Sequence, residues 1–295
     1  MVSSLLTGCA VQAEIYGLCF DSGGVYVKGS GQRKFDRILR RGSAKAASDQ
    51  DSQCVFVKGD GRSLNVINDA SIDCIITDHP WDDRLSNSGG NRRFTDYECF
   101  RYSDKDFEEK ARVLKDGCFL CEILPAENAN NFDYLYEVKK MAQRAGLCYY
   151  AKVPWIKGTF VSNTGRKAKN SEDVLILSKG TARALRPNMQ YGRDALGNPV
   201  RFMSGTRRML PTDFNIQDLP NELKICKSAK PTELFEQILD YVTVEGEVVL
   251  DQFAGSGAVG AACMKMNRYS ILIEKGDRQA SYIMRRLQMS DSIAG

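Results

Sequence analysis

The sequence predicts an α/β fold built around a mainly parallel sheet. From about residue 53 onwards, short apolar runs rich in β-branched residues alternate with amphipathic segments of helical length. Parallel strands need crossover connections of that kind, and such units are right-handed. A glycine-rich turn at residues 251–257 also joins an apolar strand to a helix, an arrangement typical of nucleotide-binding α/β domains.

Four elements are predicted between residues 54 and 114. The apolar runs Cys54–Val57 and Ile72–Thr77 indicate buried strands, and Ser63–Asp69 between them has room for a short crossover helix. A helix is expected at Asp104–Leu114, because Ser103 can cap its N-terminus and acidic residues occupy its first turn. These elements form one strand–helix–strand unit and the start of the next.

The later elements continue the same alternation. Lys115–Gly117 ends the preceding helix, and Pro231 can occupy the first turn of a later one. The predicted elements are a strand at Cys118–Leu124, a helix around Asn131–Ala145, strands near Tyr149–Ile156 and Val174–Leu177, a helix from Pro231 through Tyr241, a strand at Val248–Asp251, a helix at Ala258–Met266, a strand at Tyr269–Ile273 and a final helix at Asp277–Gln288.

The composition is that of an ordinary globular protein. Hydrophobic residues make up 43% of the 295 residues and charged residues 26%, and no apolar run approaches the roughly 20 residues of a membrane span. The ten cysteines are scattered, mostly in or beside apolar runs, which favours a reduced, cytoplasmic protein. Cys118 and Cys121 have no second cysteine pair, and His79 is the only histidine, so no metal is expected.

Basic charge is concentrated in one part of the chain. Between Lys152 and Lys230 there are 15 Lys and Arg against 6 Asp and Glu, although the whole chain carries a net charge of only +4. This asymmetry is typical of a surface that binds a polyanion, but a solvated face gives the same count. From Thr181 to about Cys226 the strand–helix alternation also stops, as expected of an inserted recognition segment.

The tetrapeptide Asp78-His79-Pro80-Trp81 directly follows a predicted strand. In open α/β sheets ligands bind outside the carboxyl ends of the strands. A carboxylate and a backbone carbonyl can accept hydrogen bonds from an exocyclic amino group, and an indole can stack on a base. Taken alone, the tetrapeptide also fits a polar turn whose tryptophan plugs the core.

The turn Asp251-Gln252-Phe253-Ala254-Gly255-Ser256-Gly257 lies between a strand and a helix. Glycines let the backbone approach a ligand there, and the helix N-terminus offers free N–H groups. Glu274 closes the next strand, where an acid can accept both ribose hydroxyls of an adenosyl group. A dinucleotide site is the competing interpretation, but Gly260 falls outside its fixed glycine frame.

These two motifs together resemble those of the β class of amino-group DNA methyltransferases. The tetrapeptide is similar to their Asp-Pro-Pro-Tyr/Phe/Trp motif, the glycine turn is similar to their S-adenosylmethionine loop, and the order of the two is that of the β class. The resemblance spans roughly Val55–Leu287. Further segments in the matching order are Lys58-Gly59-Asp60, Arg112–Gly117, Ile156-Lys157-Gly158 with Lys169–Glu172, and Ala229–Leu234.

The resemblance implies a Rossmann-like methyltransferase domain with a mixed, mainly parallel sheet and a short inserted target-recognition segment. Residues 1–52 would be an N-terminal extension, 53–180 the catalytic part, 181–228 the target-recognition insertion and 229–295 the cofactor-binding part. The implied activity is methyl transfer from S-adenosylmethionine to N6 of adenine in double-stranded DNA by base flipping, in DNA methylation and restriction–modification. A homodimer, with no membrane and no metal, is expected.

The resemblance also implies a role for each site residue. We expect Asp78, His79, Pro80 and Trp81 to be catalytic, Asp251, Phe253, Gly255, Ser256 and Gly257 to line the cofactor, Glu274 to hold its ribose, Asp60 and Lys230 to contact its adenine and carboxylate ends, and Arg193, Arg201, Arg207 and Arg208 to contact DNA phosphates.

The chain departs from the family pattern at three places. His79 and Gln252 each replace a usual proline, and Cys226–Ala229 stands where a His-Pro-Thr-Gln run is common. Histidine keeps the backbone carbonyl but loses the fixed φ of proline. The alternatives are therefore an N4-cytosine DNA methyltransferase, an RNA adenine methyltransferase, and a catalytically silent DNA-binding partner of an active enzyme.

Overall fold

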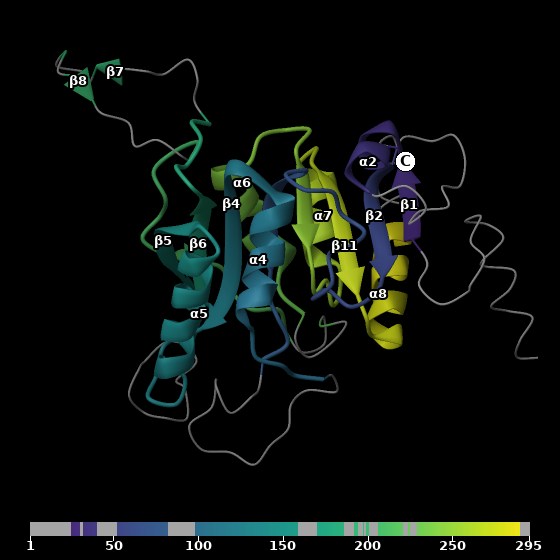
Figure 1. The fold of residues 1–295 in the computed structure, drawn as a ribbon, viewed down its shortest axis with the longest axis horizontal. Helices are drawn as coiled ribbons and strands as arrows, with labels where there is room; N and C mark the ends of the chain where they lie inside the picture. Colours follow the sequence, from purple (N-terminus) through teal and green to yellow (C-terminus); the bar gives the residue numbers. More distant parts are fainter. Residues whose placement is uncertain are drawn as a thin grey trace, which may run out of the picture.

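A mixed sheet lies at the centre of the molecule (Figure 1). The computed structural model describes residues 25–29, 32–39, 52–81, 98–158, 170–185, 192–193, 197, 199–200, 206–220, 224 and 229–289. Within them, nine strands form one sheet in the order β1-β2-β11-β10-β3-β4-β6-β5-β9. The strands are β1 Val25–Gly29, β2 Ser52–Lys58, β3 Ile72–Thr77, β4 Leu114–Pro125, β5 Leu147–Ile156, β6 Ser171–Lys179, β9 Phe214–Asn215, β10 Val248–Asp251 and β11 Tyr269–Glu274.

The middle of the sheet is parallel and its edges are mixed. Strands β2, β11, β10, β3 and β4 run in one direction, whereas β1 at one edge and β6 near the other run against their neighbours. From β10 the chain continues to β11, toward the β1 edge of the sheet. From β3 it continues to β4, toward the β9 edge, so the direction of winding changes between β10 and β3. Such a switch point opens a crevice at the carboxyl ends of the two strands.

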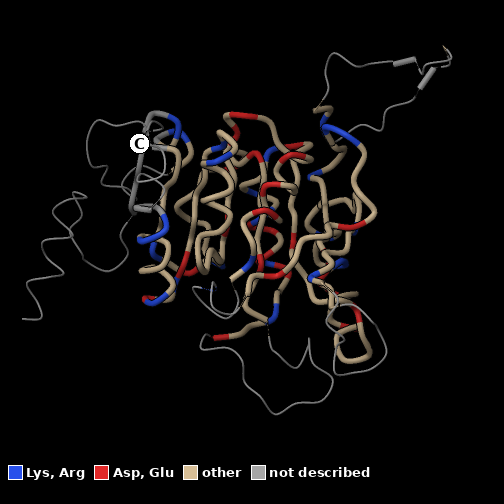
Figure 2. The backbone as a smooth tube through the Cα atoms, turned by 180° about the vertical axis from the view of Figure 1, so that it is seen from behind, with Lys and Arg blue, Asp and Glu red and all other residues tan. Residues whose placement is uncertain are grey.

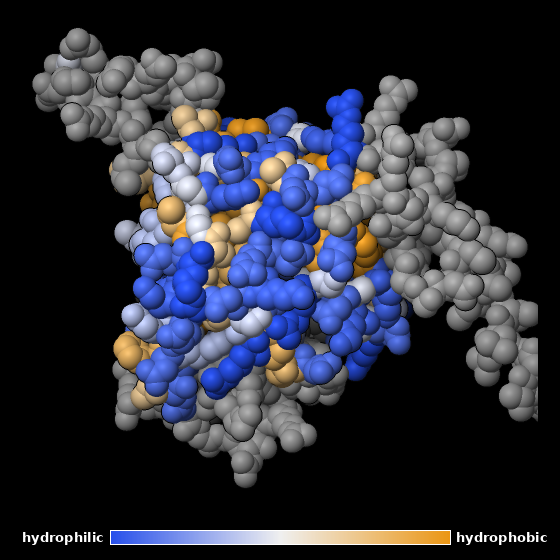
Figure 3. Space-filling model, viewed as in Figure 1, coloured by the Kyte–Doolittle hydropathy of each residue, from blue (hydrophilic) through white to orange (hydrophobic). Residues whose placement is uncertain are grey.

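Helices cover both faces of this sheet, which is the layering of an α/β domain. One apolar cluster joins the sheet to α2, α4 and α5, and a second joins it to α6 and α7. In Figure 1, α4 and α5 lie in front of the strands, and the surface of this side is largely hydrophilic (Figure 3). The helices are α2 Gln32–Ile38, α4 Asp104–Val113, α5 Phe132–Arg144, α6 Thr232–Val242, α7 Ala258–Lys265 and α8 Asp277–Met289.

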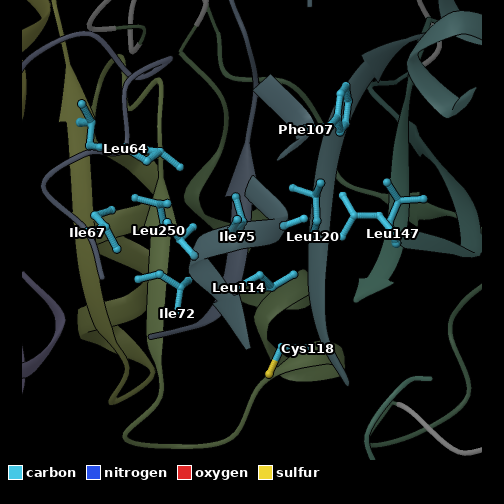
Figure 4. Packing of buried hydrophobic residues seen from close by; sticks show 14 of the residues in the cluster. Leu64, Ile67, Ile72, Ile75, Phe107, Leu114, Cys118, Leu120, Leu147 and Leu250 are labelled. Carbon is cyan, nitrogen blue, oxygen red and sulfur yellow. The ribbon is translucent and has the colours of Figure 1, made fainter. Parts of the chain in front are cut away.

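The core follows from the continuous apolar runs of the central strands. Leu250, Ile75 and Leu120 pair across three neighbouring strands, and none of them is exposed (Figure 4). Strands buried on both faces carry apolar residues at consecutive positions, because helices cover both sides. Each such side chain contributes about 1.5–3 kcal/mol of burial, so the core fixes the strand ends that carry the polar motifs.

Three expectations about the fold need correction or extension. No helix forms at Ser63–Asp69; this stretch makes turns, and Ile67 bridges Leu39. The predicted extension 1–52 contributes β1 and α2, because β1 adds an antiparallel strand at the open edge of β2. The predicted insertion returns β9 to the sheet beside β5 and adds a small hairpin of β7 Gly192–Arg193 and β8 Pro199–Val200.

Candidate active site

A pocket lies where β3 and β10 end side by side. The two strands are parallel neighbours through the pairs Val249 with Cys74 and Leu250 with Ile75, so both chains leave the sheet at the same edge. The pocket has a volume of about 410 Å³ and is lined by residues of both motifs. This size is within the range of small-molecule sites in proteins.

The Asp78 carboxylate faces this pocket from the end of β3. Its Oδ2 atom pairs with the ammonium group of Lys230, whereas Oδ1 is buried and has no hydrogen-bond partner among the described residues. Burial raises the pKa of Asp78, and the nearby Lys230 charge opposes that rise. One carboxylate oxygen is therefore held in place and the other is left as an acceptor.

Lys230 is part of a chain of charges behind Asp78. Its ammonium group also lies 3.4 Å from Oε2 of Glu172, and Lys157 pairs with Oε1 of the same carboxylate. Burial would raise the pKa of Glu172, but the two lysines lower it below its usual value. The sequence predicts a cofactor contact for Lys230; the structure instead pairs it with Asp78, which is 152 positions away in the sequence.

The aromatic wall of the pocket differs from the prediction. Trp81 packs against the core and stacks on His79, with the two ring centroids 5.8 Å apart. It is not among the described residues that line the pocket. Phe100 and Phe253 do line the pocket, with ring centroids 5.3 Å apart. Phe100 is tied to the tetrapeptide because its N–H donates to the Pro80 carbonyl at 3.1 Å.

The glycine turn after β10 forms the opposite wall. Gly255 has a φ of +50°, and its N–H donates to Oε2 of Glu274 at 2.9 Å. The other oxygen of Glu274 accepts from the Gly276 N–H at 2.7 Å, so the carboxylate is held by backbone on both sides. Ser256 and Phe253 also line the pocket. The turn and the acid thus meet as the sequence predicts.

Two predicted cofactor residues lie at the margins of the pocket. Asp60 is exposed at the rim, 3.7 Å from the Lys275 ammonium group. Gly257 has a φ of +75° at the start of α7, but it is not among the described lining residues. A Cβ there would meet Ile283 of α8 at 3.3 Å. Gly257 therefore belongs to the turn that begins α7 and faces α8, and it does not contribute to the described pocket lining.

Replacing Glu274 with alanine is expected to weaken binding of the adenosyl cofactor. Losing a charged hydrogen-bond acceptor costs about 1.5–3 kcal/mol, and the Gly255 and Gly276 N–H groups also lose their partner. Calorimetric titration with S-adenosylmethionine measures the change. Asp277→Ala, at an exposed acid three residues along the chain, is the matched control and should leave the affinity unchanged. Equal affinity of Glu274→Ala and wild type would contradict the assignment.

Asp251 makes the stability of the fold depend on pH. Burial raises the pKa of its carboxyl from 3.8 to about 8, against the hydrogen bond from the Phe253 N–H. Between about pH 4 and 8 the folded protein binds a proton that the unfolded chain has lost. The stability that this group contributes is therefore complete below about pH 4 and is lost as the pH rises to about 8.

The variant Asp251→Asn cannot ionise at this position, so it should not lose stability through this group as the pH rises. Its free energy of unfolding relative to wild type should rise from about pH 5 to about pH 8 and then level off. Denaturant titrations across this range measure the difference, with Asp133→Asn, at an exposed acid on α5, as the control. A difference that stays constant or falls with pH would contradict a raised pKa for Asp251.

The predicted phosphate contacts are not gathered at the pocket. Arg207 and Arg208 both pair with Asp240, near the C-terminal end of α6. Asp240 lies roughly 12 Å along the axis from the first residue of α6, at 1.5 Å per residue, whereas Lys230 precedes that first residue at the pocket. Arg201 lies outside the described residues, and only the backbone of Arg193 is described. Figure 2 shows basic residues at both sides of the molecule.

Several residues of the site were not predicted from the sequence. Arg62 holds the wall of the pocket, because it bonds Asp106 at 2.8 Å through two nitrogens and its guanidinium lies 4.5 Å from the Phe100 ring centroid. Glu122 lies behind the tetrapeptide in the middle of β4. Glu122 is the single charged residue in the apolar run Cys118–Leu124, and this is the signal that could have indicated it.

Comparison with known proteins identifies the family. A family model described as DNA methylase, of N6 and N4 methyltransferases, matches residues 72–285. This chain belongs to that family. The matched stretch runs from β3 into α8 and includes the tetrapeptide, the glycine turn and Glu274, so the predicted family is confirmed.

Relatives of this methylase include restriction–modification proteins. The type II methyltransferase M.HpaI of Haemophilus parainfluenzae is 23% identical over 223 residues, which cover 72% of this chain and 67% of that protein. The Mod subunit of the probable type III restriction-modification enzyme HindVI of Haemophilus influenzae is 42% identical over 59 residues, or 20% of this chain and 8% of that protein.

Solved methyltransferase structures share the fold of this methylase. A putative DNA modification methylase of Thermus thermophilus, complexed with S-adenosyl-L-methionine, superposes with a TM-score of 0.52 at 20% identity and covers 78% of this chain and 93% of that one. The cytosine-N4-specific PvuII DNA methyltransferase gives a TM-score of 0.54 at 16% identity, with 80% and 86% covered. The predicted Rossmann-like methyltransferase fold is confirmed.

Among the described residues, no group of three or more His, Cys, Asp or Glu side chains is placed to hold a metal ion. None of the helices that the structure describes is long and apolar enough to cross a membrane.

Proposed function

We propose that this methylase transfers a methyl group from S-adenosylmethionine to N6 of adenine in double-stranded DNA, with the base flipped out of the helix. The observation that carries this proposal is the Asp78 carboxylate. Its Oδ1 atom is buried without a partner among the described residues, and it faces the pocket that the glycine turn and Glu274 also line. A polar atom buried without a partner is costly unless a ligand completes it.

The residues of the second wall fit the cofactor. Glu274 offers an acceptor for the ribose hydroxyls, and Gly255 has the positive φ that lets the backbone turn away from a ligand. Phe253 and Phe100 supply apolar contact. S-adenosylmethionine brings an activated methyl group on its sulfonium, so the protein supplies mainly position and electrostatics.

The tetrapeptide supplies the position. In the proposed reaction Asp78 and the His79 carbonyl accept hydrogen bonds from the exocyclic amino group and orient its nitrogen. The carboxylate also stabilises positive charge that develops on that nitrogen. Lys230 holds Oδ2, so Oδ1 is the acceptor that remains. The flipped base would stack on Trp81, the last residue of the tetrapeptide, or on Phe100, whose N–H donates to the Pro80 carbonyl.

The choice of adenine rests on the residue type at position 78. A carboxylate is a stronger acceptor than a hydroxyl, and it better offsets charge on the attacking nitrogen. A carboxylate at this place is more common in adenine enzymes of the family, whereas serine more often marks cytosine enzymes. Transfer to N4 of cytosine is the second candidate, favoured by the fold shared with the cytosine-N4-specific PvuII enzyme.

Transfer of labelled methyl groups tests the proposal. The protein is incubated with labelled S-adenosylmethionine and either unmethylated duplex DNA or RNA. We expect label in DNA and none in RNA. Label in RNA alone would favour an RNA methyltransferase, and binding of DNA without transfer would favour a silent partner of an active enzyme; either result would contradict the proposal.

The roles of Arg193, Arg201, Arg207 and Arg208 in DNA binding stay a prediction, as does a homodimer. Each phosphate contact contributes about −0.9 to the slope of log K against log salt. If Arg207 and Arg208 contact phosphates, replacing both with alanine should weaken DNA binding and flatten that slope. Binding of the cofactor should not change, because both arginines pair with Asp240 of α6 and neither is among the described residues that line the pocket. Equal slopes would place the DNA surface elsewhere.

A further inference from the structure

A cluster of buried polar side chains lies directly behind the tetrapeptide. The His79 ring is not exposed; its Nε2 is 3.1 Å from the Tyr134 hydroxyl, and its Nδ1 is 3.3 Å from Oε1 of Glu122. Glu122 comes from β4 and Tyr134 from α5. The histidine of the tetrapeptide is therefore held between two elements that lie outside the pocket.

An ion pair completes the cluster. Lys110 of α4 donates to Oε2 of Glu122 at 2.7 Å, and neither side chain is exposed. Tyr102 donates its hydroxyl to Oε1 of Glu122, and the Lys110 ammonium lies 3.8 Å from the Tyr102 ring centroid. Burial alone would raise the pKa of Glu122, but Lys110 and His79 lower it below its usual value. Glu122 is therefore held as a carboxylate.

The hydrogen-bond pattern selects one tautomer of His79. The Tyr134 hydroxyl accepts from the Tyr102 backbone N–H at 3.1 Å, so its own proton is available for Nε2 of His79. The ring hydrogen then belongs on Nδ1, which faces the Glu122 carboxylate. In this arrangement Tyr134 donates to Nε2, whereas Nδ1 lies within ion-pair distance of Oε1 of Glu122 but outside hydrogen-bond geometry.

Stabilisation of the fold is a weak explanation for this buried cluster. Replacing a buried ion pair with apolar residues of similar volume is often neutral or stabilising, so a buried pair is weak evidence of stabilisation. What the cluster does fix is the ring of His79, which is one of the residues that line the pocket. The centroid of that ring lies 5.8 Å from the ring centroid of Trp81 and 5.6 Å from that of Phe100. These two rings are the candidate surfaces for stacking a base.

We propose that the side chain of His79, held by Glu122 and Tyr134, is a positioning residue for methyl transfer that fixes its own carbonyl and the neighbouring aromatic surfaces. The inference rests on the proposed function and adds residues from β4 and α5 to it. A histidine so held replaces the rigidity that a proline ring gives the backbone. Misplacing a reacting group by about 1 Å can cost on the order of 100-fold in rate.

Variants of His79 test the proposal in the full-length protein. His79→Leu keeps the apolar volume but removes both polar contacts, so we expect kcat for DNA methylation to fall about 10- to 100-fold. The affinity for S-adenosylmethionine should stay within roughly twofold of wild type, because the cofactor residues are on the other wall. His79→Asn retains a donor that can reach Glu122, so it should recover part of the lost kcat.

A double-mutant cycle with Tyr134 keeps the test valid if His79→Leu folds poorly. Tyr134→Phe alone should lower kcat, and it should add little in the His79→Leu background, because both changes break the same contact. Tyr241→Phe is the control: this buried tyrosine packs against Phe214 in the apolar cluster on the other face of the sheet, and its loss should leave kcat unchanged.

The outcomes separate this inference from the proposed function. Wild-type kcat retained by both His79→Leu and Tyr134→Phe would overturn the positioning role while leaving DNA methylation intact. Equal losses in His79→Leu and His79→Asn would also overturn it, because the polar contact would then not matter. No transfer by the wild type, with S-adenosylmethionine bound, would overturn the proposed function and the positioning role together.

Discussion

Replacing Asp78 with alanine is expected to reduce methyl transfer at least about 100- to 1,000-fold, the cost of removing one preorganised group that stabilises developing charge. The change removes the unpartnered acceptor Oδ1 and the partner that holds Lys230. Single-turnover transfer from labelled S-adenosylmethionine to DNA measures the loss. Cofactor affinity should be close to that of wild type, since Glu274 and the glycine turn, the proposed cofactor contacts, are unchanged.

Asp78→Asn separates charge from hydrogen bonding. Asparagine keeps an acceptor oxygen but cannot offset positive charge, so its rate should lie between those of wild type and Asp78→Ala. Asp213→Asn, at a half-exposed acid beside β9, controls for the loss of one negative charge. If Asp78→Ala transferred methyl groups at the wild-type rate, the tetrapeptide would not be the catalytic motif.

Gly61→Ala is expected to damage the pocket through the backbone. A Cβ at Gly61 would lie 1.8 Å from the Gln252 carbonyl oxygen and 2.8 Å from the Phe253 ring, so the glycine turn would have to move. Overpacking of this kind typically costs about 1–3 kcal/mol, and more where backbone must shift. The Gly61 carbonyl also accepts a hydrogen bond from the side-chain amide of Gln252 at 2.7 Å. We expect a lower unfolding temperature and a loss of cofactor affinity.

Gly59→Ala is a matched control in the same loop. A Cβ at Gly59 would meet only Val57, at an ordinary contact distance of 4.0 Å, and its φ is not in the left-handed region. The same substitution two residues away should therefore leave both the unfolding temperature and the cofactor affinity nearly unchanged. Equal effects of the two variants would mean that the contact between Gly61 and Gln252 does not hold the turn.

The parts of the fold that the sequence predicts are those governed by local pattern. Central strands such as Ile72–Thr77 are continuous apolar runs because both faces are covered, and their length separates them from helices. The helix at Asp104–Val113 begins at a capping box formed by Ser103 and Asp106. Two parts of the site are likewise recognisable from residue type and position. They are Gly255, which takes a positive φ in the glycine turn, and the acid Glu274 at the end of the next strand.

The remaining features depend on contacts between distant segments. The sequence leaves room for a short helix at Ser63–Asp69, but the apolar residues of this stretch join the cluster that includes α2, and no local pattern reveals that contact. Lys230 reaches Asp78 only because α6 begins beside the end of β3. The buried contact of His79 with Glu122 joins the tetrapeptide to β4. In each of these contacts the two residues are far apart in the sequence, and neither residue type by itself indicates its partner.

Nucleoside mass spectrometry of methylated DNA tests the central claim most directly. Unmethylated genomic DNA is incubated with the wild-type protein and labelled S-adenosylmethionine, then digested to nucleosides, with Asp78→Ala run in parallel. The acceptor geometry of Asp78 predicts labelled N6-methyladenine from the wild type and none from Asp78→Ala. Labelled N4-methylcytosine, or DNA that binds but carries no label, would contradict the proposed activity.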